Sequence, residues 1–331
     1  MIIARTPVRV SFFGGGTDYP EYFLQHGGEV LATAINKYAY ITVNPRADFF
    51  DESIRVSYSK TELANTLDEL QHTAVCECLR YADIHRNIEI NYISDLPART
   101  GLGSSSSFVV CLLHALWAYK GKMVSCDDLA YQAIEIERDI LKENVGVQDQ
   151  YMAAVGGFRH AEFVGMKNIR SKPVIISPER LQALKGRLAL YYTGIQRSAN
   201  EVAGEQIKRT EINVPYLGEM KALVREALQV LESDRDLSEF GKLLDATWKL
   251  KKSLSARISN SHVDEIYEAA IKAGATGGKL LGAGAGGFIL LYIEPERREN
   301  VREALSALKE VDFNFEPAGS QIIYYQPSTG N

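Results

Sequence analysis

A glycine- and serine-rich segment near residue 100 has the composition of a phosphate-binding loop. It follows a strand-like run and opens an apolar run that predicts a helix. Glycines let the backbone approach a ligand closely, and the first N–H groups of a helix attract anions. The serine hydroxyls can also reach a phosphate-bound Mg²⁺. On composition alone, a serine-capped helix after a flexible turn fits equally well. The residues that we expect to contact the phosphates are Gly101, Leu102, Gly103, Ser104, Ser105 and Ser106.

This segment differs from the two common nucleotide-binding loops. No Lys-Ser or Lys-Thr pair follows the second glycine, and Ser106 stands where the dinucleotide-binding fingerprint has its third glycine. A formal fingerprint occurs at Gly282, Gly284 and Gly287, but it leads into the strand-like run 288–292 instead of a helix. Taken alone, this second glycine segment is also compatible with a tight hairpin.

A third glycine segment follows the first strand-like run of the chain. Arg9 lies in that run, and three glycines ending at Gly16 lead into Thr17 and Asp18. A carboxylate accepts hydrogen bonds from sugar hydroxyls, so Gly16, Thr17 and Asp18 are candidates for binding a small polar ligand. The same residues are also typical of a surface turn.

Asp149 stands apart from the other acidic residues of the stretch 135–149. Most of these have the distribution of solvated surface groups, whereas Asp149 lies among uncharged and small residues at 146–154. A carboxylate in such surroundings needs a partner, so Asp149 is a candidate site residue.

Zinc and hydrolase chemistry are disfavoured by residue spacing. His72, Cys76, Cys78 and His85 lack the usual finger spacings, and on one helix only the first two share a face closely. The serine run lacks the G-x-S-x-G elbow of a hydrolase nucleophile. The four cysteines show no CxxC spacing, which predicts reduced thiols.

The elements that must position these segments alternate between strands and helices. Their order predicts an α+β protein in two parts, with domains at 1–180 and 181–331. Strands are expected at 2–13, 29–43, 54–58, 88–93, 158–163, 174–176, 188–192, 278–281, 288–293 and 313–325. Helices are expected at 61–85, 108–119, 126–142, 146–155, 199–254, 262–272 and 295–308.

Composition limits the class of protein. The chain has 331 residues, 46% hydrophobic and 24% charged, with a net charge of −5, which is an ordinary globular balance without the basic footprint of a nucleic-acid binder. Its uncharged runs are too short or too polar for a membrane span, and no signal peptide is evident. We therefore expect a cytoplasmic protein without nucleic-acid or membrane partners, either monomer or homodimer.

In order and spacing, the three glycine segments resemble those of the GHMP small-molecule kinase superfamily, which includes galactokinase, homoserine kinase, mevalonate kinase and phosphomevalonate kinase. The matching segments are 7–19, 96–106 and 279–288, and the resemblance covers essentially the whole chain. It implies a two-domain α+β fold, with an N-terminal domain like that of a ribosomal protein and a ferredoxin-like C-terminal domain. It also implies a kinase that uses ATP and Mg²⁺.

The resemblance assigns roles to residues at the matching positions. Asp149 falls on the catalytic aspartate of the family and Arg9 on the arginine beside it. Glu137 falls on the acid that ligates Mg²⁺, and Ser105 is the expected hydroxyl partner of that metal. A carboxylate beside an arginine stays ionised and can accept the proton of a substrate hydroxyl.

The substrate contacts implied by the resemblance come from two glycine segments. Asp18 would bind sugar hydroxyls, and the loop with Gly284 and Ala285 would close over the phosphates and substrate. The superfamily's sugar 1-kinases usually carry Gly-Glu-His-Thr-Asp where this chain has Gly14-Gly-Gly-Thr-Asp18, which speaks against galactokinase itself. Two glycines leave room for a larger, already phosphorylated sugar.

The first segment and the sequence around Asp149 are most similar to the heptose 7-phosphate kinases and next to the fucokinases. The resemblance therefore implies phosphorylation of the anomeric hydroxyl of D-glycero-D-manno-heptose 7-phosphate. A kinase of a free sugar such as L-fucose, a non-catalytic sugar sensor and a decarboxylase of the superfamily remain alternatives. The acceptor phosphate needs a cation, and the sequence does not rank the candidates Arg99, Arg197, Lys208 and Lys249.

Overall fold

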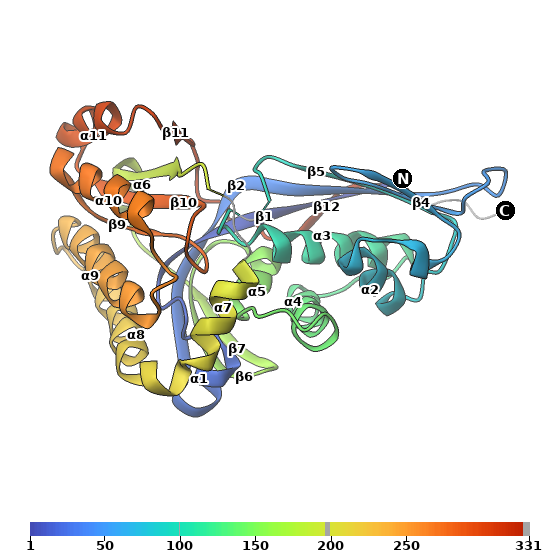
Figure 1. Ribbon diagram of the computed structural model, residues 1–331, viewed down its shortest axis with the longest axis horizontal. Coiled ribbons are helices and arrows are strands. Elements are labelled where there is room, and N and C mark those ends of the chain that lie inside the picture. The colour runs from blue at the N-terminus through green and yellow to red at the C-terminus, as the bar shows by residue number, and fades with distance from the viewer. Residues whose placement is uncertain (99, 196–198, 327–331) are drawn as a thin grey trace.

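The computed structural model describes residues 1–98, 100–195 and 199–326 (Figure 1). Two cationic candidates for the acceptor phosphate, Arg99 and Arg197, lie outside these described residues. The described chain folds around two β-sheets, each with helices packed on it. The α+β class expected from the sequence is confirmed.

The larger sheet is built from both ends of the chain. Its main path runs β12, β1, β2, β5, β3, β4, while β6 pairs with the first part of β2 and β7 pairs with β6. The long strands β1 and β2 are rich in β-branched and aromatic residues and bury most of their side chains, so they form a rigid support for the turn between them. The strands are β1 Ile2–Phe13, β2 Gly28–Pro45, β3 Ile54–Ser57, β4 Thr61–Ala64, β5 Ile88–Ser94, β6 Phe158–Gly165, β7 Asn168–Pro173 and β12 Gln321–Tyr325.

Helices α2 to α5 lie along one side of this sheet, below it in Figure 1. Helix α3 buries nearly every residue from Ser106 to Leu116, because it packs between the sheet and the neighbouring helices. A π-helical turn, Glu135–Ile140, follows α4 directly. The helices of this half are α1 Pro20–His26, α2 Thr73–Tyr81, α3 Ser104–Tyr119, α4 Cys126–Ile134 and α5 Gln148–Val155, with a short 3₁₀ turn at Leu67–Glu69.

The smaller sheet is antiparallel, in the order β11, β8, β10, β9. Its central strand β10 is fully buried, with apolar side chains on both faces. The strands are β8 Leu188–Tyr192, β9 Ala275–Leu280, β10 Phe288–Ile293 and β11 Lys309–Glu310. The helices are α6 Pro178–Arg187, α7 Ala199–Lys208, α8 Thr210–Glu232, α9 Ser238–Leu254, α10 Ser261–Ala273 and α11 Arg298–Ala304, with a 3₁₀ turn at Pro295–Arg297.

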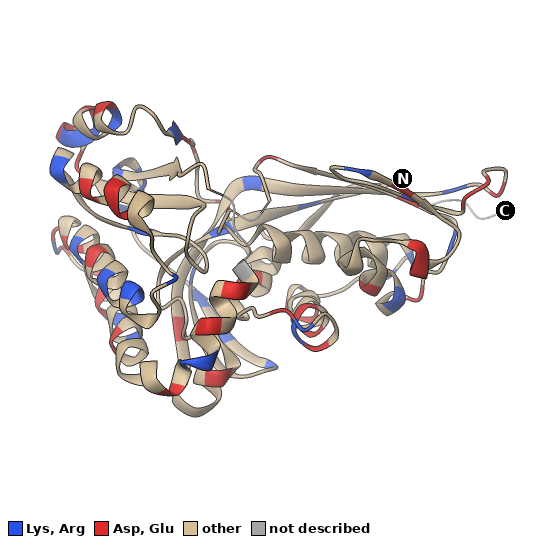
Figure 2. Ribbon diagram, viewed as in Figure 1, with Lys and Arg blue, Asp and Glu red and all other residues tan. Residues whose placement is uncertain are grey.

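Acidic and basic residues are interspersed along the helices of both halves (Figure 2). Within the described ranges, no helix combines the length and the apolar character that a membrane span requires.

Several expectations about the elements differ from the structure. The strand expected at 174–176 does not form, because these residues connect β7 to α6 without regular structure. The helix expected over 199–254 is divided into α7, α8 and α9. The helix expected over 61–85 is wrong in its first part, because Thr61–Ala64 pairs with β3 as an antiparallel strand and α2 begins only at Thr73. The strand expected over 313–325 is shorter in the structure: it is β12, Gln321–Tyr325, which pairs with β1. The last strand of the chain therefore joins the first sheet. The domain boundary near residue 180, close to the start of α6, stays a prediction.

Candidate functional site

The loop between β5 and α3 has the geometry of an anion site. Gly101 and Gly103 have φ values of +83° and +74°, which residues with side chains rarely adopt. Helix α3 begins directly after Gly103. Among the described residues, no hydrogen bond occupies the backbone N–H groups of the three residues that open the helix. These N–H groups and the helix dipole fit the phosphates of a nucleotide.

The second glycine segment packs against this loop, backbone to backbone. It connects β9 to β10 as a hairpin, as one interpretation of the sequence proposed. An added Cβ at Gly282 would lie 2.4 Å from the Cα of Gly101, and one at Gly287 would lie 2.3 Å from the carbonyl oxygen of Thr100. The N–H of Phe288 donates to the same carbonyl at 3.1 Å. Side chains at these glycines would separate the two loops, so the smaller sheet holds the loop between β5 and α3 in place. We call this loop, which includes Gly101 and Gly103, the phosphate loop after its proposed role.

Gly284 and Ala285 lie on the part of the hairpin that contacts Ile258. Ala285 is buried, and its N–H donates to the Ile258 carbonyl at 2.8 Å. Asn260 donates to the carbonyl of Ala285 at 3.0 Å. The expected contact of these two residues with substrate stays a prediction.

Arg9 and Asp149 form a two-pronged ion pair beside the phosphate loop. Arg9 Nε donates to Asp149 Oδ1 at 2.8 Å, and its Nη2 donates to Oδ2 at 2.7 Å. The third guanidinium nitrogen donates to the Gly101 carbonyl at 2.9 Å. Arg9 is 4% exposed, whereas the Asp149 side chain is 25% exposed. The pair therefore joins β1, α5 and the phosphate loop while leaving the carboxylate accessible.

Glu137 is a buried carboxylate held by neutral donors. It lies in the π-helical turn and accepts a hydrogen bond from Ser106 Oγ at 2.7 Å and another from the Gln150 amide. Burial raises its pKa to about 7 against the opposing effect of these donors. No ion pair joins it to a cation within the described ranges. A carboxylate in this setting fits a divalent cation.

The hydroxyl bonded to Glu137 is that of Ser106, and the expectation that Ser105 is the hydroxyl partner of the metal stays a prediction. Ser105 is exposed on the first turn of α3, and Ser104 and Ser106 are buried. In the described part of the chain, no three His, Cys, Asp or Glu side chains gather into a preformed metal cluster. A metal here would therefore depend on oxygens of the nucleotide phosphates for its remaining ligands.

The turn Gly14–Asp18 is held by its own side chains. The Thr17 hydroxyl donates to the carbonyls of Gly14 and Glu29, at 2.8 and 2.9 Å, so it fixes the turn from inside. Asp18 accepts the N–H of Gly16 at 2.9 Å. Burial, and then the nearby charge of Asp149, raise the pKa of Asp18. The structure thus brings the carboxylates of Asp18 and Asp149 near each other.

Two buried lysines, which sequence reasoning missed, complete the site. Lys251 of α9 donates to the carbonyls of Leu280, at 3.2 Å, and Gly282. Lys279 of β9 donates to the Phe12 carbonyl at 2.9 Å, which ties the smaller sheet to the end of β1. Burial lowers the pKa of both ammonium groups, and the positive charge of Arg9 lowers both further. The charge of Lys251 also lowers the pKa of Lys279.

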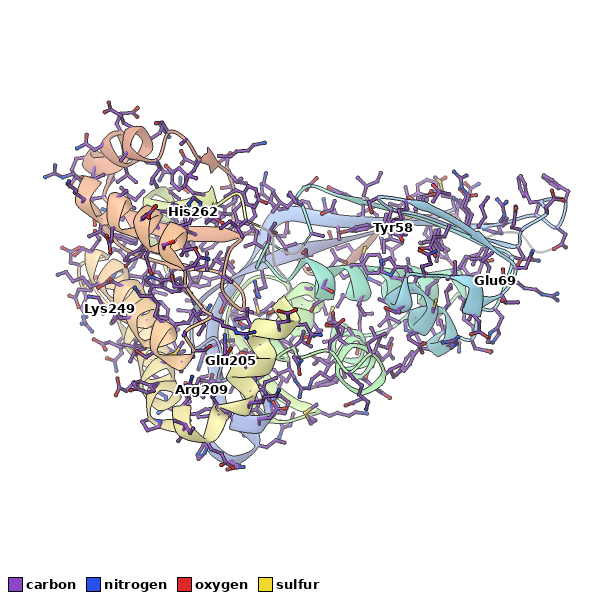
Figure 3. The ribbon with its side chains drawn as sticks, in the orientation of Figure 1. Tyr58, Glu69, Glu205, Arg209, Lys249 and His262 are labelled. Atoms are coloured by element: carbon purple, nitrogen blue, oxygen red, sulfur yellow. The ribbon has the colours of Figure 1, made fainter. Side chains whose placement is uncertain are left out.

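The lysines that the sequence did single out lie elsewhere. Lys249 is 70% exposed and pairs with Asp245, and Figure 3 shows it on the outer side of α9. Lys208 is also exposed. Lys251 lies three residues after the buried Trp248 and seven after the buried Leu244, so all three share the inward face of α9. This spacing is the sequence signal that could have identified Lys251.

The stability contributed at Lys251 is expected to depend on pH. Its folded-state pKa is about 8 against an ordinary 10.5, so between these pH values the unfolded chain binds more protons than the folded one. Raising the pH from about 8 to about 10 should therefore stabilise the native protein relative to Lys251→Met, by about 2 kcal/mol. Urea unfolding of both proteins across this range measures the difference.

The exposed Lys249→Met variant is the control, and its difference from the native protein should not change with pH in this way. A pH-independent difference for Lys251→Met would show that the ammonium titrates as it does in the unfolded chain.

Two family models match the chain. The model described as GHMP kinases N terminal domain matches residues 65–157, which include the phosphate loop, Glu137 and Asp149. The model described as GHMP kinases C terminal matches residues 219–310, which include Lys251 and the glycine hairpin.

Similar proteins cover nearly the full chain. It is 32% identical to a D-glycero-alpha-D-manno-heptose 7-phosphate kinase of Campylobacter jejuni, over 96% of this chain and 97% of that protein. It is 27% identical to an L-fucokinase/L-fucose-1-P guanylyltransferase of Bacteroides fragilis, over 92% of this chain and 36% of that longer protein.

Solved structures share the architecture. A D-glycero-D-manno-heptose 1-phosphate kinase of Bacteroides thetaiotaomicron superposes with a TM-score of 0.80 at 25% identity, over 98% of this chain and 100% of that one. A galactokinase of Lactococcus lactis has a TM-score of 0.74 at 18% identity, over 97% and 94%, which is a likeness of fold. The fold implied by the three glycine segments is confirmed.

Proposed function

The chain belongs to the GHMP kinase family of ATP-dependent phosphotransferases, and from this premise we propose that it phosphorylates the anomeric hydroxyl of D-glycero-D-manno-heptose 7-phosphate. The products would be the 1,7-bisphosphate and ADP, on the way to nucleotide-activated heptose. The similarity to heptose kinases along nearly the whole chain supports this acceptor.

One observation carries the proposal: the accessible carboxylate of Asp149 lies at the phosphate loop. An added Cβ at Gly103 would lie only 3.2 Å from Asp149 Oδ2, so the carboxylate stands where α3 begins. A hydroxyl bound there would lose its proton to Asp149 as it attacks the phosphoryl group. The two hydrogen bonds from Arg9 orient the carboxylate.

The described residues also fit Mg·ATP. The N–H groups at the start of α3 would hold the phosphates, and Glu137 with the hydroxyl of Ser105 or Ser106 would hold the metal. When bound, Mg²⁺ neutralises the charge that develops on the transferred phosphoryl group. Lys251 and Lys279 would hold the hairpin and β1 in register around the phosphates through their bonds to backbone carbonyls.

A kinase of a free sugar such as L-fucose is the second candidate. It is favoured by the similarity to the L-fucokinase portion of the Bacteroides fragilis protein. A sugar sensor needs neither a base nor a buried acid for metal, and Asp149 and Glu137 would serve these two roles, which disfavours a non-catalytic role.

A panel of acceptors tests the choice of sugar. We expect the kcat/KM for heptose 7-phosphate to exceed that for L-fucose, D-mannose and D-galactose by at least about 100-fold, because a sugar lacking the phosphate loses a charged contact. Release of ADP at saturating Mg·ATP measures each rate. If a free hexose is phosphorylated as fast as heptose 7-phosphate or faster, heptose 7-phosphate is not the preferred acceptor.

A further inference from the structure

Two buried polar atoms beside the Gly14–Asp18 turn have no hydrogen-bond partner among the described residues. They are the hydroxyl of Ser11 and the side-chain carbonyl oxygen Oε1 of Gln148. Ser11 is 5% exposed and Gln148 is 7% exposed. An unpartnered polar atom in a buried position costs stability. An unpartnered buried atom calls for an explanation, and a bound ligand that supplies the missing partner is one.

Both side chains adjoin the Arg9–Asp149 pair. Side chains alternate between the faces of a strand, so Ser11 lies on the same face of β1 as Arg9, about 6.8 Å further along. Gln148 precedes Asp149 at the start of α5, and its backbone N–H lies 3.5 Å from Asp18 Oδ2. The two unpartnered atoms thus belong to side chains adjacent to Arg9 on β1 and to Asp149 on α5.

The turn leaves space next to these atoms. An added Cβ at Gly15 would lie 3.6 Å from Ser11 Oγ and 3.9 Å from Gln148 Nε2, with no third contact within 4 Å. At Gly14, by contrast, an added Cβ would lie 1.9 Å from a backbone carbonyl of β2. Gly15 is partly exposed, so the space beside it borders polar atoms and is reachable from outside.

We propose that Ser11 and Gln148, with the space beside Gly15, form a subsite for hydroxyl groups of the acceptor's sugar ring. One ring hydroxyl donates to Gln148 Oε1, and a neighbouring ring oxygen accepts the Ser11 hydroxyl. Asp18 and Asp149 only accept hydrogen bonds when ionised, so the Ser11 hydroxyl adds a donor that the carboxylates lack. The inference rests on the proposed function and deepens it by naming residues that select the sugar.

Three variants test the subsite: Ser11→Ala, Gln148→Leu and Gly15→Ala. The φ of Gly15 is outside the left-handed region and its contacts are ordinary, so a methyl group fits without strain and fills the space. In all three we expect the KM for the sugar to rise about tenfold or more, with kcat changed less than about threefold and the KM for Mg·ATP within about twofold.

The melting temperature of the ligand-free protein separates binding from a structural role. We expect it to stay level or rise in Ser11→Ala and Gly15→Ala, because the first removes an unpaired polar atom and the second stiffens the unfolded chain. Ser320→Ala is the matched control, since its buried hydroxyl is bonded to Thr6 and His114. It should lower the melting temperature and leave the sugar KM unchanged.

Monodeoxy analogues of the acceptor make the test specific. The native protein should discriminate against one of them by about tenfold or more, and Gln148→Leu by less than about threefold, because the two changes remove the same hydrogen bond. A lowered melting temperature in Ser11→Ala with an unchanged sugar KM would overturn the proposal.

Failure of the proposed function would look different. The native protein would then transfer phosphate to an acceptor other than heptose 7-phosphate. The same variants measured with that acceptor would still raise its KM if the subsite exists, and would leave it unchanged if it does not.

Discussion

Replacing Asp149 by asparagine is expected to lower the turnover number by about 10²- to 10⁴-fold, while Mg·ATP binding changes by less than about threefold. Asparagine has nearly the same shape but cannot accept the proton of the attacking hydroxyl. The proposed nucleotide contacts come from the phosphate loop and the Glu137 region, which the substitution leaves in place. Single-turnover rates and nucleotide titration measure the two quantities.

The substitution also removes the negative charge that pairs with the buried guanidinium of Arg9. Arg9 is 4% exposed, and in Asp149→Asn it would face a neutral amide. We expect a stability loss of about 1–3 kcal/mol, so activity should be compared well below the melting temperature. Glu162→Gln, a change to an acidic residue of β6 outside the site, is a control for removing a carboxylate. Turnover of Asp149→Asn within tenfold of the native protein would remove Asp149 from the role of base.

Replacing Glu137 by glutamine is expected to raise the Mg²⁺ concentration needed for half-maximal activity by about tenfold or more. In the proposed site Glu137 supplies a charged oxygen ligand, and an amide binds Mg²⁺ far less strongly. The stability of the metal-free protein should not fall at neutral pH, because the change removes a carboxylate that burial disfavours. Activity at fixed ATP across a Mg²⁺ series gives the shift.

Glu135→Gln is the matched control for this substitution. Glu135 lies in the same π-helical turn, but it accepts a hydrogen bond from Tyr81 and not from the phosphate-loop serines. Its Mg²⁺ requirement should equal that of the native protein. An unchanged Mg²⁺ titration in Glu137→Gln would exclude Glu137 as the metal ligand.

The sequence was sufficient to predict the fold class and the residues that meet at the phosphate loop. Glycines at 101, 282 and 287 are required by close backbone contacts and Gly103 by its positive φ, and such requirements leave a pattern of glycines that is visible in the sequence. That Asp149 needs a partner was predictable from its uncharged neighbours, whereas Arg9 was expected beside it only because the family resemblance implies the pair.

Other features depend on contacts between distant elements. Lys251 lies in a helix with other lysines nearby, and only its inward position distinguishes it from the exposed Lys249. The strand at Thr61–Ala64 forms because β3 offers it an edge, which outweighs the local helix pattern. Which serine bonds Glu137 depends on the rotation of α3, which turns Ser106 inward and leaves Ser105 exposed.

The central claim is that this site transfers phosphate to an anomeric hydroxyl, and ³¹P NMR of the product tests it most directly. Incubation with heptose 7-phosphate and Mg·ATP should give one new phosphate signal coupled to the anomeric proton, together with ADP, and Asp149→Asn should give neither on the same time scale. A product phosphorylated at another hydroxyl, or no phosphorylated heptose while ATP stays intact, would contradict the account.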